Sequence, residues 1–253
     1  MNWQKGGPVS DLLPHVDERN NFIILLTALV LFLFGDAVAV QFHLSDARSA
    51  VNLLMLATLV VNVWAVHSPS TNFLGWKLGA SMVIGMVMVG DLFTDSVALT
   101  RFQLIMMFAF FCLTIWQAWT QVMFTGVVDR NKIVGAICIY LLLGIAWALA
   151  YLIVEAFLPG SMNGLDNGVW QEKFNSLIYY SMITLTTLGY GDITPAAPVT
   201  RFLALMQAIT GIFYTTVLVA SLIGLRLSGV DNRLRLEDVR VAPGNKQEDG
   251  HDG

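Results

Sequence analysis

The chain alternates long uncharged stretches with short polar segments. The longest uncharged stretches cover residues 49–66, 102–128, 133–154 and 202–225. A helix needs about 20 apolar residues to cross the hydrocarbon core of a bilayer. The pattern therefore predicts six membrane-spanning helices, at residues 22–42, 49–67, 73–93, 97–123, 132–157 and 198–226.

The composition supports membrane insertion. Hydrophobic residues make up 56% of the 253 residues and charged residues 13%, about half the charged share of a soluble globular protein. This balance argues against a soluble enzyme, a nucleic-acid-binding protein and a disordered scaffold. Cys112 and Cys138 lie in apolar runs and predict neither a disulfide nor a metal site. We expect no enzymatic activity and no cofactor.

The lysines and arginines predict the orientation of the chain. With six spans both termini lie on one side, and that side carries ten of the 14 basic residues. Basic residues are enriched on the cytoplasmic side of a membrane. We therefore predict a multi-pass protein of the plasma membrane, which is the inner membrane in a bacterium. Residues 1–21 form a cytoplasmic N-terminus and residues 229–253 a short, polar, cytoplasmic tail.

The segment between the fifth and sixth predicted spans has a different pattern. Residues 159–168 are rich in glycine, asparagine and proline, and residues 176–188 are uncharged but too few to cross a bilayer. An apolar segment of this length is predicted to enter and leave on one side as a re-entrant helix. Irregular backbone at membrane depth is tolerated only where it is buried in protein or lines a water-filled cavity. The segment therefore predicts an aqueous path.

Residues 187–192, at the end of this segment, read TLGYGD. In this setting the segment resembles the pore signature of tetrameric potassium channels, with Leu188 in place of a valine. The resemblance is specific over about residues 132–228, whereas the first 130 residues match in layout alone. It implies an all-α membrane protein with six transmembrane helices, a re-entrant pore helix and a selectivity-filter loop per subunit, assembled as a homotetramer. The implied function is passive, selective K⁺ conduction, with K⁺ and membrane lipids as partners and no nucleic acid.

Backbone carbonyl oxygens from four copies of such a loop can replace the hydration shell of K⁺. Successive carbonyls face one axis only if the backbone alternates between right- and left-handed conformations, and glycine reaches positive φ at no steric cost. Thr187 is expected to add a ring of hydroxyl oxygens, and Tyr190 to pack away from the pore as a spacer. The filter residues are Thr187, Leu188, Gly189, Tyr190 and Gly191, of which the first four are expected to bind K⁺.

Several further residues are expected to support the pore. Asp192 at the outer mouth raises the local cation concentration. The resemblance implies that Glu155 accepts hydrogen bonds behind the filter, and that the phenols of Tyr179 and Tyr180 bond Asp192 or its neighbours. Some channels have a glutamate where this chain has Ile183, so a carboxylate clamp is missing there. Gly211 is either a gating hinge, which we favour, or a small residue for close helix packing. The residues expected to line the cavity are Ile212, Thr215, Val219 and Ile223.

The first four predicted spans form a domain, residues 22–130, that resembles a voltage sensor without its gating arginines. Residues 102–128 carry no charge, and Arg101 and Arg130 only flank them. Moving a charge across the membrane field is what makes gating voltage-dependent. We therefore expect conduction to depend little or not at all on voltage. The pore domain covers residues 131–228.

The alternatives are a non-conducting sensor or regulatory subunit that keeps the pore fold, a poorly selective cation pore, and an ion-coupled transporter that uses Asp36 and Asp91. Transporters generally show broken helices in both of two repeated halves, whereas one re-entrant segment is visible here. Interfacial solvation also explains the two aspartates. Protons, lipids, membrane tension and constitutive leak all stay open as gating stimuli.

Overall fold

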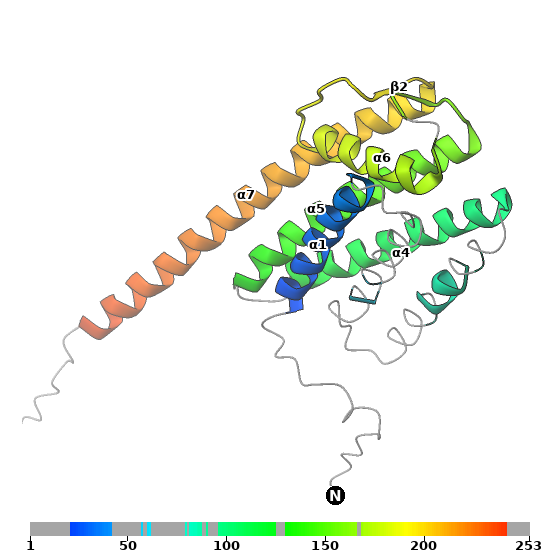
Figure 1. Cartoon of the computed structure of the whole chain (residues 1–253). Helices are drawn as coiled ribbons and strands as arrows, with labels where there is room; N and C mark the ends of the chain where they lie inside the picture. Colours follow the sequence, from blue (N-terminus) through cyan, green and yellow to red (C-terminus); the bar gives the residue numbers. More distant parts are fainter. Residues whose placement is uncertain are drawn as a thin grey trace, which may run out of the picture. The chain divides into compact units, whose positions relative to one another are not determined.

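The computed structural model describes residues 21–41, 57, 60–61, 79, 81–87, 90, 96–124, 130–165 and 168–241. Its helices are shown in Figure 1: α1 (Asn21–Gln41), α4 (Val97–Phe124), α5 (Arg130–Phe157), α6 (Trp170–Leu185) and α7 (Pro198–Val241). Two short strands, β1 (Met162–Asn163) and β2 (Thr194–Pro195), pair antiparallel. The chain divides into two compact units, Met1–Ile212 and Phe213–Gly253, with the boundary inside α7.

Three of the described helices are long and apolar enough to cross a membrane. They cover Val97–Val122, Lys132–Phe157 and Pro198–Leu218, and α1 contributes a shorter apolar stretch, Phe22–Gly35. The predicted first, fourth, fifth and sixth spans are therefore helices. The second and third predicted spans lie mostly outside the described residues, so the count of six stays a prediction, as does the domain boundary after residue 130.

α7 is longer than the predicted sixth span. The helix continues past residue 226 to Val241, so the segment that we expected to be a polar tail from residue 229 begins as helix. Proline is the residue that stops a helix most strongly, and Pro243 is the first proline after the start of α7. Helices usually end at or before the residue that precedes a proline, which fits the observed end.

α5 lies at the centre of the first unit, in contact with α1, α4 and α6. α4 runs antiparallel to it: Val122 near the end of α4 lies next to Gly135 near the start of α5, and Arg101 near the start of α4 bonds Ala156 near the end of α5. Short connections make consecutive helices antiparallel neighbours, and five residues join these two.

Gly135 allows the helices to approach closely. A side-chain carbon at this position would lie 2.8 Å from Val122 and 3.2 Å from the Phe22 ring of α1. The Cys138 thiol, one turn further along α5, donates to the Phe22 carbonyl over 3.3 Å. α1 therefore starts beside the start of α5 and runs parallel to it, as Figure 1 shows. These directions match a chain that crosses back and forth, as the predicted topology requires.

Candidate functional site

The chain between α5 and α7 starts and returns at the same end of α5. At the start of α6, Lys173 Nζ lies 3.5 Å from Glu155 Oε1 near the end of α5. The 16 residues of α6 give a length of about 24 Å, short of the ~30 Å hydrocarbon core. After α6 the chain returns, because β2 pairs with β1, and β1 follows α5. This is a re-entrant path.

The boundaries of this helix differ from the uncharged stretch at 176–188. α6 begins earlier, at Trp170, and includes the charged residues Glu172 and Lys173 in its first two turns. It ends at Leu185, so residues 186–188 belong to the turn that follows. Lack of charge therefore marks neither end of the helix.

The C-terminal end of α6 has the hydrogen bonds of a Schellman motif. The Leu188 N–H donates to the Ile183 carbonyl (2.8 Å), and the Thr187 N–H donates to the Thr184 carbonyl (3.0 Å). The motif needs a left-handed residue just after the cap, where glycine is usual. Thr187 takes this position with φ = 61°, and no other non-glycine residue in the described part of the chain has positive φ. Such strain costs about 1–3 kcal/mol and is concentrated at functional sites.

The left-handed conformation then recurs at every second residue. φ is 61° at Thr187, 51° at Gly189 and 83° at Gly191. The positive φ expected of the two glycines is confirmed, and Thr187 extends the alternation by one step. A strand cannot alternate in this way, because all its residues have negative φ. The segment is therefore a loop of alternating handedness that begins directly at the end of a helix.

The side chains of this loop lie outside the core of the single chain. Leu188 is 56% exposed and Tyr190 is 67% exposed, and Thr187 and Asp192 are exposed as well. The packing that we expected of Tyr190 is not made by the part of the chain that the structure describes.

One of the two tyrosines on α6 interacts with the end of the loop. A hydrogen bond from the Tyr179 hydroxyl to the Asp192 carboxylate raises the pKa of Tyr179 above its ordinary value, and partial desolvation adds to this shift. Tyr180 lies elsewhere, and the expectation was wrong for it. Its buried ring packs edge-on against Tyr151 of α5, with centroids 5.1 Å apart. Neighbours along a helix face different directions, so one tyrosine meets the loop and the other meets α5.

Glu155 is buried and accepts hydrogen bonds, but its partners lie in the turn after α5 and not in the loop. Its Oε1 accepts from the Gly160 N–H (3.0 Å), and its Oε2 accepts from the N–H and hydroxyl of Ser161. The N–H of Met162 adds a longer bond of 3.3 Å. With Lys173 as its counter-ion, the carboxylate fixes the turn to α5 and to the start of α6.

Ser161 continues these contacts to α7. Its carbonyl accepts from the N–H groups of Ala196 (2.9 Å) and Ala197 (3.1 Å) and from the Thr200 hydroxyl (2.8 Å). We call Glu155, Ser161, Lys173 and Thr200 the outer clasp. It joins the end of α5, the start of α6 and the start of α7. Gly164, just beyond it, has φ = 82°, and a side chain there would overlap the Asp192 carbonyl, so this turn lies directly on the backbone that follows the loop.

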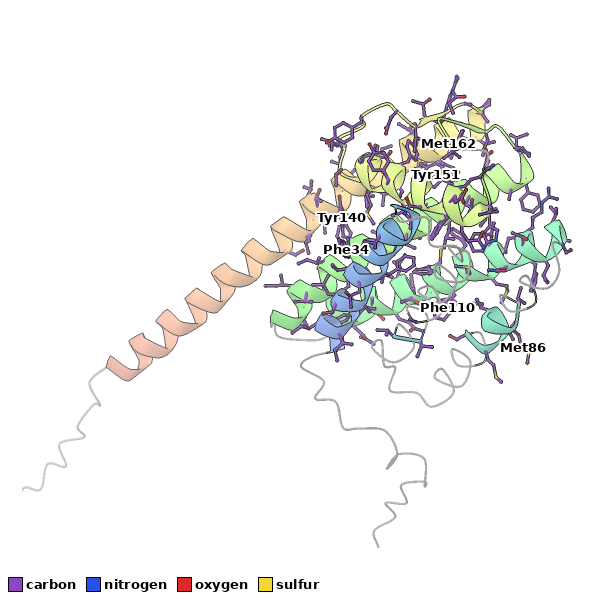
Figure 2. All side chains as sticks on the ribbon, in the orientation of Figure 1. Phe34, Met86, Phe110, Tyr140, Tyr151 and Met162 are labelled. Carbon is purple, nitrogen blue, oxygen red and sulfur yellow. The ribbon has the colours of Figure 1, made fainter. Side chains whose placement is uncertain are left out.

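A second set of buried hydrogen bonds was not expected from the sequence. The Tyr151 hydroxyl of α5 donates to Gln207 Oε1 of α7 over 2.8 Å. Gln207 Nε2 donates to the carbonyl (2.9 Å) and hydroxyl (2.6 Å) of Ser181 on α6. The Ser181 hydroxyl donates to the Gly144 carbonyl of α5 over 2.6 Å. Figure 2 shows Tyr151 among the side chains of α5 and α6. A glutamine in the middle of an apolar span was the available signal, since such residues hydrogen-bond across helices.

α7 is an unbroken helix through Gly211. A side-chain carbon at Gly211 would overlap the Leu185 carbonyl at the end of α6, so the glycine permits close packing here. Its role as a hinge stays a prediction. Of the residues expected to line a cavity, Ile212 is 54% exposed and Thr215 is exposed. The side chains of Val219 and Ile223 lie outside the described part of the chain.

Arg101 lies near the start of α4 and is held against α5. Its Nε donates to the Ala156 carbonyl over 3.1 Å, and its guanidinium lies 4.8 Å from the centre of the Phe157 ring. A cation at a helix C-terminus is favourable because the last carbonyls carry partial negative charge. Asp91 and the side chain of Asp36 lie outside the described residues, so their roles are untested.

Residues 136–225 match the model of a protein family described as ion channel. No curated protein matches the chain. The matched region begins in α5, includes α6, the loop and the outer clasp, and ends in α7. Two helices that are long and apolar enough to cross a membrane flank the short re-entrant helix in this region, and this part of the chain is similar to an ion-channel domain.

Proposed function

We propose that the chain is the subunit of a K⁺-selective channel that conducts passively across the plasma membrane. The alternation of handedness at Thr187, Gly189 and Gly191 is the observation that carries this proposal. It is the backbone conformation that a carbonyl-lined filter requires, in a loop that reads TLGYG. Rings of such carbonyls replace the hydration shell of K⁺. Transport of this kind needs no catalytic step and no cofactor, only K⁺ as the permeant ion.

We propose a homotetramer, because one loop supplies one side of a pore. The exposure of Leu188 and Tyr190 leaves the loop open in a single subunit. The first turns of α7 also expose an apolar row at helical spacing, made of Val199, Phe202, Leu205, Ile209 and Ile212. In an assembly, neighbouring subunits would cover part of this row and lipid the remainder. Both termini are proposed to lie in the cytoplasm.

We propose little or no dependence of conduction on voltage. Apart from Arg101 close to its start, α4 carries no charged residue. Arg101 is fixed to the end of α5 by a hydrogen bond and a ring contact, so the charge that α4 could move is small. Steep voltage dependence requires several gating charges in each subunit.

Flux through purified protein in liposomes tests the proposal. A K⁺ gradient and then a Na⁺ gradient are applied to the wild type and to Gly189→Ala. Within the described part of the chain, a Cβ at Gly189 meets no atom beyond its two neighbours within 4 Å, so we expect the substitution to act through the backbone at positive φ or through neighbouring subunits. Gly160→Ala is the matched control, since Gly160 also has positive φ and open space but lies in the turn after α5.

K⁺ flux that Ba²⁺ blocks, that Gly189→Ala abolishes and that Gly160→Ala keeps would support a selective filter. Equal Na⁺ and K⁺ flux would leave a cation channel and contradict the selectivity. If neither ion passes at any pH or voltage, a non-conducting subunit that keeps the pore fold becomes the better explanation.

A further inference from the structure

We infer that Gln207 is a positioning residue for the filter. Through its hydrogen bonds to Ser181 it holds α6, and with α6 the turn at Thr187, in the geometry that selects K⁺. This inference rests on the proposed function and adds a determinant of selectivity that lies outside the filter loop, on α7.

The hydrogen bonds of Gln207 have one consistent arrangement. The Ser181 carbonyl can only accept, so the amide nitrogen of Gln207 must face it. Gln207 Oε1 is then the acceptor for the Tyr151 hydroxyl. The Ser181 hydroxyl accepts from Gln207 Nε2 and donates to the Gly144 carbonyl. Every donor in the series has an acceptor, and fully satisfied buried networks give a structure one well-defined arrangement.

The network is sealed from solvent. Gln207 and Ser181 are each 0% exposed, as is Tyr151. Water cannot replace a lost partner at such a site without entering the core, and an unsatisfied buried polar group is costly. A change at Gln207 therefore acts on the position of Ser181, because the Ser181 carbonyl and hydroxyl each lose a bond that ties them to α7.

The position of Ser181 determines where α6 ends. α6 and α7 touch again one turn further along both helices, where Gly211 lies against the Leu185 carbonyl. The steps from Ser181 to Leu185 and from Gln207 to Gly211 are equal, so the two contacts fix both the height and the rotation of α6. Leu185 is followed by the cap at Thr186 and by Thr187. Displacement of α6 would therefore move the first carbonyls of the filter.

The test compares the ratio of K⁺ to Na⁺ flux per reconstituted protein in liposomes. Gln207→Leu keeps a similar volume and removes all three bonds of the amide. Tyr151→Phe removes one hydroxyl and is the milder variant if Gln207→Leu does not fold. Thr114→Val is the matched control, because the buried Thr114 hydroxyl of α4 bonds the Phe110 carbonyl of its own helix. The thermal unfolding midpoint of each variant in detergent is measured alongside.

We expect Gln207→Leu to lower the flux ratio about tenfold, as the loss of a buried partner can, and Tyr151→Phe to lower it by a smaller factor. Thr114→Val should keep the wild-type ratio. Ser181→Ala combined with Gln207→Leu should cost less than the sum of the two single variants, since both remove the bond between Gln207 Nε2 and the Ser181 hydroxyl. A role in stability alone would lower the unfolding midpoint and leave the ratio unchanged.

The inference is overturned if folded Gln207→Leu and Tyr151→Phe both keep the wild-type ratio while the wild type selects K⁺. A wild type without selectivity overturns the proposed function instead, and the inference with it. The wild-type measurement thus separates the two failures.

Discussion

Glu155 and Ser161 are joined by two hydrogen bonds to a single carboxylate oxygen. The N–H and the hydroxyl of Ser161 both donate to Glu155 Oε2, over 2.9 and 2.8 Å. The carbonyl of the same serine accepts bonds from the residues that lead into α7. Glu155 therefore organises the outer clasp from a position six residues earlier in the chain.

Glu155→Gln is expected to destabilise the protein. The amide loses the ion pair with Lys173 and offers one acceptor oxygen in place of two to a cluster of donors. Hydrogen bonds to charged groups contribute about 1.5–3 kcal/mol, so the thermal unfolding midpoint in detergent should fall clearly. Glu172→Gln makes the same chemical change at an exposed site one turn into α6 and should stay within about 0.5 kcal/mol of the wild type. Equal midpoints for the two variants would contradict the clasp.

Tyr179→Phe tests the bond between α6 and Asp192, the residue that follows the loop. Tyrosine is charged when it loses its proton, and the raised pKa of Tyr179 means that the folded state keeps this proton to a higher pH than the unfolded chain. The stabilisation is therefore complete at neutral pH and is lost as the pH rises through the raised pKa.

An alkaline titration of tyrosinate absorbance on the folded protein measures this directly. Of the six tyrosines, the one missing in Tyr179→Phe should account for an ionisation above the ordinary range near pH 10. A difference titration centred below that range would contradict the bond to Asp192. K⁺ flux of the wild type should also decline across the same alkaline interval.

Thr187→Gly should separate stability from conduction. Glycine relieves the strain of φ = 61°, which is about 1–3 kcal/mol for a left-handed β-branched residue, although its greater freedom in the unfolded chain offsets about 1 kcal/mol. The variant should therefore unfold no earlier than the wild type, yet K⁺ flux should fall because the hydroxyl is gone. Thr187→Ser keeps the hydroxyl and should conduct better than Thr187→Gly. Wild-type flux through Thr187→Gly would show that the hydroxyl is dispensable.

Arg101→Gln should leave the voltage dependence of the current unchanged. Arg101 bonds the Ala156 carbonyl and the Phe157 ring, so we expect it to attach α4 to α5 and not to move in the field. The substitution should lower the thermal unfolding midpoint, because a cation–ring contact near the surface contributes about 0.5–1 kcal/mol to the free energy of unfolding. Arg101→Lys keeps the charge but not the planar donor, and should recover part of this loss. A shift of the current–voltage relation in Arg101→Gln would instead assign it a sensing role.

The parts that the sequence predicted are those with a local signal. Uncharged length marks α4, α5 and the first half of α7, and the two glycines of the loop require left-handed backbone wherever they lie. The positive φ of Thr187 was not predicted, because a Schellman motif is usually recognised by its glycine and this one has a β-branched residue in that position. Tyr180 was misplaced because a single residue step along α6 changes which neighbour it meets.

The hydrogen bonds of Gln207 could not be predicted from any single segment of the sequence. Tyr151, Ser181 and Gln207 come from three helices, and their contact follows only once the faces of those helices are known. The polar residue in each apolar segment was visible, but its partner was not. The outer clasp has the same character, since Ser161 meets Thr200 across the whole of α6 and the loop.

The contacts of Ser161 also have a consequence for local unfolding. The segment between Ser161 and Ala196 contains α6 and the loop. Its two ends lie together, because the Ala196 N–H donates to the Ser161 carbonyl. Such a segment can open and reclose as a cooperative unit while α5 and α7 stay folded. Amide hydrogen exchange in α6 would then depend on the Ser161 contacts together with the bonds that join Ser181 to Gln207 and Gly144, and loss of the Ser161 contacts should speed exchange in the whole segment.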